Sequence, residues 1–254
     1  MKKFIFLTVK FIIFLLLFCQ CTNDSMVEGG RLSTLPGACF PEVSDKYIYP
    51  VTPGMEEWQK SDDIYSLVQL PDGVLKSIST FGLIDALVNS PLFAGFYFLS
   101  NSSSPVETWQ SHYARFNCAK ELFQRKDAGN ALVTYYSSVC FDCLESSAKP
   151  LEVKEQIMGL EFLFTKQEIL DNIPHIKKQV LIANFLRKYE QMPDAIYRVF
   201  PMVWIMNADR YRPLVDYYQD KAEYLQILLN GFIPDYNQVD IIISFAKSFI
   251  NDKS

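Results

Sequence analysis

Apolar residues recur at helical spacing along most of the chain, and this pattern predicts a protein built from helices. The clearest case follows Ser104-Pro-Val-Glu107, a capping box with proline at the first helical position. The apolar positions after it are Val106, Trp109, Tyr113, Phe116 and Phe123. Arg125 and Lys126 then bring positive charge, which is typical of a helix C-terminus. The stretch predicts one amphipathic helix that ends near Arg125.

A second helix is expected directly after this one. Asp127 stands at its N-cap position, and the apolar stripe continues through Ala128, Ala131, Leu132, Tyr135 and Tyr136. Almost no loop separates the two helices, so the chain must fold back as a hairpin or bend sharply.

The remaining chain carries further helix signals. Thr165-Lys-Gln-Glu168 is a second capping box, and Pro174 precedes a long apolar helix. Pro201 lies inside the next apolar pattern and is expected to kink or divide that helix. Pro213 begins another helix, which Gly231 is expected to stop. The last helix carries Val239, Ile242, Ile243, Ala246, Phe249 and Ile250 on one face.

The fold class predicted from these elements is all-α. Hairpins begin near Pro105, Pro150 and Pro193, at intervals typical of helical-repeat units. No repeat signature recurs at these places. The sequence therefore leaves open an irregular helical bundle, a short array of α-hairpins, or a superhelix that resembles helical repeats.

The first twenty residues predict a signal peptide. Lys2 and Lys3 precede the apolar run Phe11–Phe18, and Cys19-Gln-Cys21 follows it. Lys10 interrupts the apolar stretch and leaves it shorter than the roughly 20 residues that a spanning helix needs. A cysteine directly after such a run is typical of bacterial lipoprotein signals, in which the cysteine is lipidated.

Cys21 is our choice for the lipid anchor, with Cys19 as the alternative, because the polar Thr-Asn-Asp-Ser after Cys21 would suit a tether. An ordinary secretory signal with incidental cysteines is the competing interpretation. Residues 21–48 are polar and broken by glycine and proline, and we expect a flexible tether there. The all-helical domain would then span residues 49–254.

Charge limits the class of partner. The chain has a net charge of −5 and would lose Lys2, Lys3 and Lys10 with the leader. No cluster of Lys or Arg accompanies the aromatic residues, so nucleic acid and anionic lipid surfaces are poor partners on electrostatic grounds. Lipid contact is expected only through the anchor.

The sequence identifies no catalytic residue, metal ligand or cofactor. His112 and His175 are its only histidines, and neither has a second histidine at helical spacing. We expect both to be surface or helix-packing residues. The chain has no nucleophile elbow, no phosphate-binding glycine loop and no dinucleotide fingerprint.

Cys140-Phe-Asp-Cys143 is the sharpest chemical motif. In an exported protein it could close as a local disulfide, exchange disulfides, or supply half of a zinc site with Cys39 and Cys118. A thioredoxin-like role would require a strand before the motif, whereas a helix is predicted there. We expect a disulfide between Cys140 and Cys143 with a structural role.

Several short motifs together resemble an uncharacterised family of Bacteroidota-type lipoproteins. They are Tyr49-Pro50 with Thr52-Pro53-Gly54 and Trp58, Lys76-x-x-Ser79-Thr80 running to Pro91-Leu92, and Glu121-Leu122-x-x-Arg125-x-Asp127-Ala128-Gly129. The resemblance covers roughly residues 49 to 136. It implies export and an all-helical fold, and it implies no activity.

The function expected from these features is that of a binding or scaffold protein anchored to the bacterial envelope, most simply the outer membrane, with an unknown ligand or protein partner. Aromatic residues at Phe93–Phe98 and at Tyr211, Tyr217 and Tyr218 are candidate surfaces, although core packing would also account for them. The alternatives are an envelope hydrolase and a redox or metal protein that uses Cys140 and Cys143.

Overall fold

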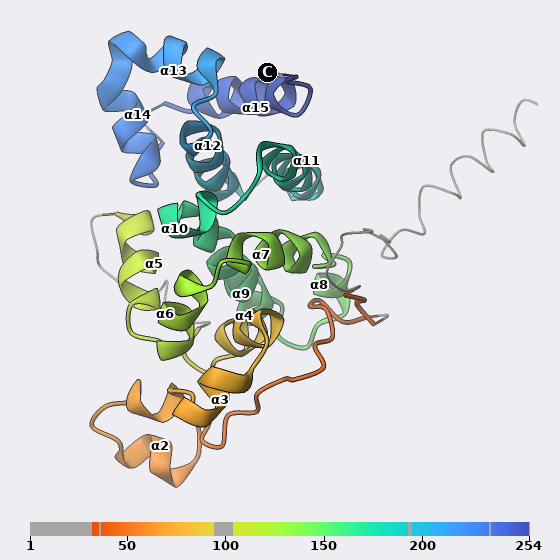
Figure 1. Ribbon diagram of the computed structural model, residues 1–254, viewed down its shortest axis with the longest axis vertical. Helices are drawn as coiled ribbons and strands as arrows, with labels where there is room; N and C mark the ends of the chain where they lie inside the picture. The colour runs from red at the N-terminus through yellow and green to blue at the C-terminus, as the bar shows by residue number, and fades with distance from the viewer. Residues whose placement is uncertain (1–31, 36, 94–103, 193–194, 234, 254) are drawn as a thin grey trace, which may run out of the picture.

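The computed structural model describes residues 32–35, 37–93, 104–192, 195–233 and 235–253, and the described chain is helical with no strand (Figure 1). This confirms the all-α prediction. Helices follow one another along the long axis of the molecule, with the early helices at one end and the last helices at the other. None of the described helices is both long and apolar enough to cross a bilayer.

The first end of the molecule holds the short elements α2 (Glu56–Lys60), η1 (Ser66–Val68), α3 (Asp72–Ser77) and α4 (Thr80–Val88). The middle consists of α5 (Pro105–Tyr113), α6 (Asn117–Gln124), α7 (Ala128–Ser137), α8 (Cys143–Ser146), α9 (Pro150–Phe162), η3 (Leu163–Thr165) and α10 (Gln167–Leu170). Helix α4 is buried along most of its length against α6, α7 and α9. It is therefore the centre of this half.

The other end consists of α11 (His175–Gln191), η4 (Ile196–Arg198), α12 (Val199–Ala208), α13 (Arg212–Tyr218), η5 (Gln219–Lys221), α14 (Ala222–Leu229) and α15 (Asn237–Phe249). Helix α12 is apolar on all sides and packs against α11, α14 and α15. The buried side chains of both ends form one continuous core.

Two of the described helices have side-chain N-caps, and the one at Ser104 was predicted. The Ser79 hydroxyl accepts a hydrogen bond from the Gly82 N–H at 3.0 Å, and the Ser104 hydroxyl accepts one from the Glu107 N–H at 3.2 Å. The stop signal at Gly231 is also confirmed, because this residue adopts a φ of 86° that favours glycine. Local chemistry is sufficient to define these helix ends.

The single helix predicted from Pro105 to Arg125 is instead two helices, α5 and α6, which are separated at residues 114–116. The reason is a tertiary contact at Asn117. Its side-chain amide donates to the Leu70 carbonyl at 2.8 Å, and its side-chain oxygen accepts from the Leu70 N–H at 2.9 Å. This pairing with a segment distant in sequence holds α6 in a new direction.

Three other helix boundaries that were predicted from proline or capping residues agree only in part with the structure. Pro201 lies in the first turn of α12, where its missing N–H costs no helical bond, so the chain divides just before it. The predicted cap at Thr165 is wrong, since its hydroxyl donates to the Phe162 carbonyl at 2.8 Å and α10 has no side-chain cap. The helix predicted after Pro213 is interrupted by η5.

The flexible tether predicted for residues 21–48 is wrong over its described part. The Asp45 carboxylate accepts hydrogen bonds from the Ser79 N–H and hydroxyl, and thereby caps α4. Tyr49 is buried and donates its hydroxyl proton to the Ala86 carbonyl at 2.9 Å. Residues from Leu32 onward therefore belong to the packed domain, which begins earlier than the predicted boundary at residue 49.

A pair of opposite charges lies in the centre of the core. The Arg198 guanidinium donates through Nε to Glu161 Oε1 at 2.9 Å, and both side chains are at most 1% exposed. The Tyr136 hydroxyl donates to the same carboxylate oxygen at 2.7 Å. Burial alone would lower the pKa of Arg198, but the Glu161 carboxylate raises it, so the guanidinium stays charged. The pair joins α9, α7 and η4.

Lys188 extends this buried network to the loop after α7. Its ammonium donates to the carbonyl of Tyr136 in the last turn of α7 at 2.8 Å and to that of Val139 just beyond the helix at 3.0 Å. The Tyr136 and Phe141 rings lie 4.0 and 4.8 Å from its nitrogen. Burial lowers the pKa of Lys188 well below its usual value, although the Glu161 charge opposes this.

Removing one member of the central pair should destabilise the fold strongly. Arg198→Met leaves the Glu161 carboxylate buried without its counter-charge, which costs about 3–5 kcal/mol of unfolding free energy. The double variant Glu161→Gln/Arg198→Met removes both charges and should recover a large part of that loss. Chemical denaturation followed by circular dichroism would measure both. Equal losses in the single and double variants would contradict this account.

Candidate functional site

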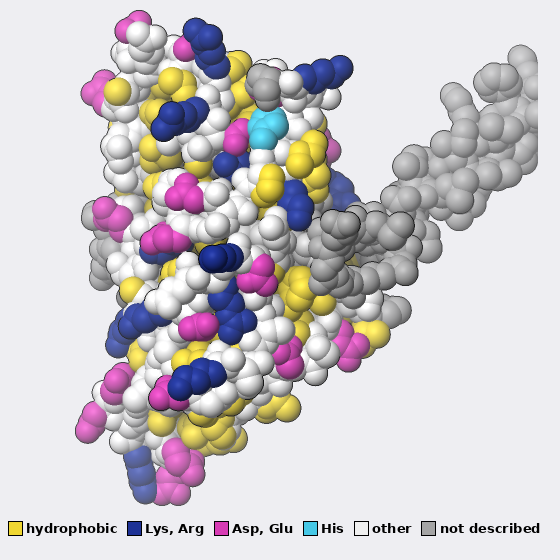
Figure 2. All heavy atoms as spheres, viewed as in Figure 1, with side chains coloured by type: hydrophobic (Ala, Val, Ile, Leu, Met, Phe, Trp, Pro, Cys, Tyr) yellow, Lys and Arg dark blue, Asp and Glu magenta, His cyan; other side chains and the backbone are white. Residues whose placement is uncertain are grey.

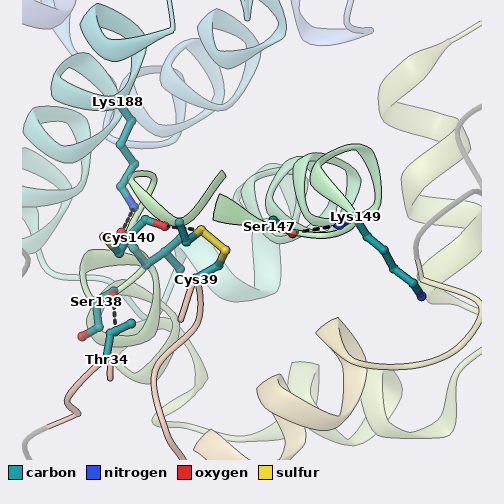
Figure 3. The surroundings of a disulfide bond; sticks show 9 residues. Thr34, Cys39, Ser138, Cys140, Ser147, Lys149 and Lys188 are labelled. Atoms are coloured by element: carbon teal, nitrogen blue, oxygen red, sulfur yellow. Dashed lines mark hydrogen bonds between the residues drawn. A yellow bond between two sulfur atoms is a disulfide. The ribbon is translucent and has the colours of Figure 1, made fainter. Parts of the chain in front are cut away.

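The sharpest chemical feature of the described chain is a disulfide between Cys39 and Cys143 (Figure 3). It joins the segment before α2 to the first residue of α8, and the two Cα atoms are 5.2 Å apart. The Cys140 N–H also donates to the Cys39 carbonyl at 2.9 Å. The Thr34 hydroxyl donates to the Ser138 carbonyl at 2.5 Å. The start of the domain is thus fixed to the loop between α7 and α8.

The predicted local disulfide between Cys140 and Cys143 is wrong. Cys143 pairs with Cys39 instead. The Cys143 Sγ still lies 3.1 Å from the Cys140 carbonyl oxygen. The short spacing between Cys140 and Cys143 favoured a local pair. That prediction failed because tertiary packing brings residues 32–49 back to the α7–α8 loop. No local pattern in the sequence indicates that route.

The described cysteines also do not form the zinc site that was considered as an alternative. Cys118 is a free, fully buried cysteine in α6, and burial raises the pKa of its thiol to about 12. Such a thiol is a poor nucleophile and a poor metal ligand, since both roles require the thiolate. Within the described residues, no group of three or more His, Cys, Asp and Glu side chains could hold a metal ion.

His112 is a core residue in a cluster of aromatic rings. Its ring centroid lies 4.9 Å from that of Phe116 and 5.7 Å from that of Trp109. Its Nδ1 is 3.0 Å from the Tyr65 hydroxyl. Burial lowers the pKa of His112 to about 3, although a hydrogen bond with the main chain of Leu92 opposes the shift. The ring is therefore neutral at physiological pH and is inaccessible to a substrate.

The rest of this aromatic cluster also fills space. The Tyr113 hydroxyl donates to the Gly159 carbonyl at 2.6 Å. A Cβ atom at Gly159 would lie only 2.6 Å from the Phe93 ring, so glycine permits α9 to approach α5 closely. Phe93, the first residue of the candidate segment Phe93–Phe98, is fully buried here. Residues 94–98 lie outside the described residues.

His175 packs at the other end of the molecule, at the N-terminus of α11. Its Nδ1 and the Lys178 ammonium both contact the carboxylate of Asp209, the C-cap residue of α12. A carboxylate that orients an imidazole is also found in catalytic dyads. Here Nε2, the atom that would act on a substrate, is buried, and the ring stacks edge-on to Phe249 at 5.4 Å. The cluster therefore joins α11, α12 and α15.

The candidate tyrosine surface is mostly core. Tyr211 is 5% exposed and Tyr218 is 1% exposed, and only Tyr217 is half-buried. The Tyr218 hydroxyl donates to Gln238 at 2.6 Å and so ties α13 to α15. The exposed apolar side chains at this end are others, Val215, Tyr224, Ile227, Phe232 and Tyr236. Sequence reasoning missed them because a helical stripe does not reveal whether a neighbour covers it.

Loss of the Cys39–Cys143 bond should destabilise the fold. The bond joins residues 104 positions apart, and removing a native disulfide typically costs about 2–5 kcal/mol because the unfolded chain gains freedom. Cys39→Ala should lower the denaturation midpoint in an oxidised sample, whereas Ser44→Ala, an exposed change in the same segment, should leave it unchanged. Mass mapping of non-reduced peptides should recover the Cys39–Cys143 pair. Recovery of a Cys140–Cys143 pair would contradict the structure.

The buried His112 should make the fold sensitive to acid. Its pKa in the folded state is about 3, below the value of about 6.5 in the unfolded chain, so the unfolded state binds more protons between these values. The contribution of His112 to the free energy of unfolding is complete above about pH 6.5. It falls by up to about 1.4 kcal/mol per pH unit as the pH is lowered toward 3. Urea unfolding from pH 7 to pH 5 should show this slope in wild type. His112→Gln should reduce the slope, and an unchanged slope would refute the assignment.

Comparisons of the chain with known protein families, with curated proteins and with solved structures found no match.

Proposed function

We propose that this chain is an exported, lipid-anchored binding or scaffold protein of the bacterial envelope, and that it binds a protein partner through α14. The leader-like start and the cysteines at positions 19 and 21 support export and anchoring. The Cys39–Cys143 disulfide supports the same location, because such bonds persist in oxidising compartments.

The observation that carries the binding role is the exposed apolar surface of α14. Only Leu228 of this helix is buried, although most of its residues are apolar. Tyr224 and Ile227 are each 37% exposed, and Phe232, just beyond the helix, is 43% exposed. We call these three residues the α14 surface. Contiguous apolar side chains at a surface are typical of protein interaction sites.

The α14 surface is held in place from behind. The Trp204 indole N–H donates to the Leu229 carbonyl at 2.8 Å, and the Ser104 hydroxyl donates to the Asn230 carbonyl at 2.7 Å. The positive φ of Gly231 then returns the chain, so that the Phe232 N–H donates to the Ile227 carbonyl at 3.0 Å. Binding to a preformed surface costs little ordering entropy, which suits a scaffold.

The charges around the α14 surface are of both signs. The Lys221 ammonium lies 4.3 Å from the centre of the Tyr217 ring. Asp220 directly precedes Lys221, and Glu223 stands two positions after it. A mixed polar rim around aromatic and aliphatic side chains resembles the composition of protein interfaces. It gives no reason to favour a nucleic acid or a polyanion.

Affinity capture with the full chain as bait should separate this proposal from its alternatives. Wild type should capture a cross-linked envelope protein, and the recovery of that protein should fall at least about tenfold with Tyr224→Ser/Ile227→Ser. Removing two interface side chains should cost more than about 1.4 kcal/mol of binding free energy. Leu151→Ser is a matched control, because Leu151 is 59% exposed on a different helix, α9.

The outcomes of this experiment differ clearly. Equal recovery with the double variant would refute the α14 surface as the binding site. Turnover of an envelope polymer by the purified chain, if lost on changing one acidic residue, would favour the hydrolase alternative instead. The redox alternative would require exchange activity that depends on Cys143.

A further inference from the structure

A second exposed apolar surface lies on α11, at a distance from α14. Ile176 is 65% exposed and Val180 is 49% exposed, one helical turn apart, and the small Ala183 is exposed on the next turn. We call these three residues the α11 stripe. Leu181, Ile182 and Phe185 on the opposite face are fully buried. The helix is therefore apolar both toward the core and on part of its outer face.

Most charged residues of α11 are basic, although the protein as a whole is acidic and Glu190 lies in the last turn of this helix. From His175 to Tyr189 the helix contains no Asp or Glu. Lys178 is paired with Asp209 and Lys188 is buried, so Lys177 and Arg187 are the basic residues left beside the stripe. Figure 2 shows hydrophobic and basic side chains next to one another in the region of α11, with a histidine and acidic side chains at the border of this region. This local arrangement suits the phosphate groups of lipids better than the overall charge predicts.

The C-terminal half of α11 is linked by hydrogen bonds to the point where the described chain begins. The Arg187 guanidinium donates to the Asn184 side-chain oxygen at 3.3 Å, and the Asn184 amide donates to the Ser137 hydroxyl at 2.8 Å. The next residue, Ser138, accepts the hydrogen bond from Thr34. A continuous set of contacts thus leads from the outer side of α11 to the first described segment.

The length of chain before this segment limits how far the α11 stripe can lie from an anchor. Ten residues separate Cys21 from Leu32, and a chain of that length reaches at most about 40 Å when fully extended. A domain of this size has a diameter of about 45 Å. Because this reach is shorter than the diameter, an anchor at Cys21 favours an orientation in which the side that holds the first described segment, with α7 and the C-terminal half of α11, faces the bilayer. In Figure 1, α14 lies at the opposite edge from this side.

We infer that the α11 stripe, with Lys177 and Arg187 beside it, lies on the phospholipid surface of the membrane that holds the anchor. The inference rests on the proposed lipid anchor and adds an orientation to it. Ile176 and Val180 would insert among the headgroups, and the two basic side chains would contact phosphates. The α14 surface would then face away from the membrane, where a partner can reach it.

Fluorescence quenching in vesicles would test this orientation with the full chain. Val180→Cys places an environment-sensitive thiol probe on the α11 stripe, and Tyr236→Cys places it at the start of α15, where the side chain is 76% exposed. The buried Cys118 should resist labelling. The parent chain, treated identically, gives the background from the native cysteines. The vesicles contain phosphatidylethanolamine, phosphatidylglycerol and a spin-labelled lipid that quenches only nearby probes.

The expected result is loss of most fluorescence at position 180 and no loss at position 236. Cells fed a tagged fatty acid report separately on the anchor, which Cys19→Ser/Cys21→Ser should abolish. Fatty-acid labelling without quenching at position 180 would overturn the α11 inference and leave the anchor standing. Quenching at position 180 without fatty-acid labelling would support the α11 surface and overturn the anchor. Absence of both would refute both.

Discussion

The buried contact between Glu161 and Arg198 is the constraint on which much of this structure depends. A charge in the core is tolerated only when its partner and its hydrogen bonds are in place, so the positions of α7, α9 and η4 are mutually fixed. Lys188 adds α11 to the same network by donating to carbonyls at the end of α7. Apolar packing alone would allow these helices to slide, whereas a buried charge has few acceptable positions.

The disulfide extends that constraint to the beginning of the domain. Residues that read as a polar tether are bound to the loop after α7 through Cys39, and the same loop lies over the Lys188 ammonium. Phe141 in this loop also covers the Arg198 guanidinium, at 4.7 Å from its ring centroid. The covalent bond therefore stabilises the cover of a buried charged network. This explains a structural role for the cysteines without any redox chemistry.

The two exposed apolar surfaces have different surroundings, and this difference organises the proposed function. The α14 surface has charges of both signs and a rigid hydrogen-bonded support, as a protein interface has. The charged residues of α11 from His175 to Tyr189 are all basic, and the C-terminal half of this helix contacts the residue next to the one that binds the first described segment. A protein held at one side and open at the other could present a partner-binding surface at a fixed distance from a membrane.

The sequence by itself determined the helical class and those helix ends that local chemistry defines. Ser79, Ser104 and Gly231 act within a few residues of their own position, so their caps and stops were predictable. Tertiary structure alone decided the break before Asn117, the packing of residues 32–49 and the partner of Cys143. Each depends on a contact between segments far apart in sequence, such as Asn117 with Leu70 or Cys39 with Cys143. Helical periodicity also cannot distinguish a covered stripe from an open one, and α11 and α14 therefore became candidate surfaces only once their neighbours were known.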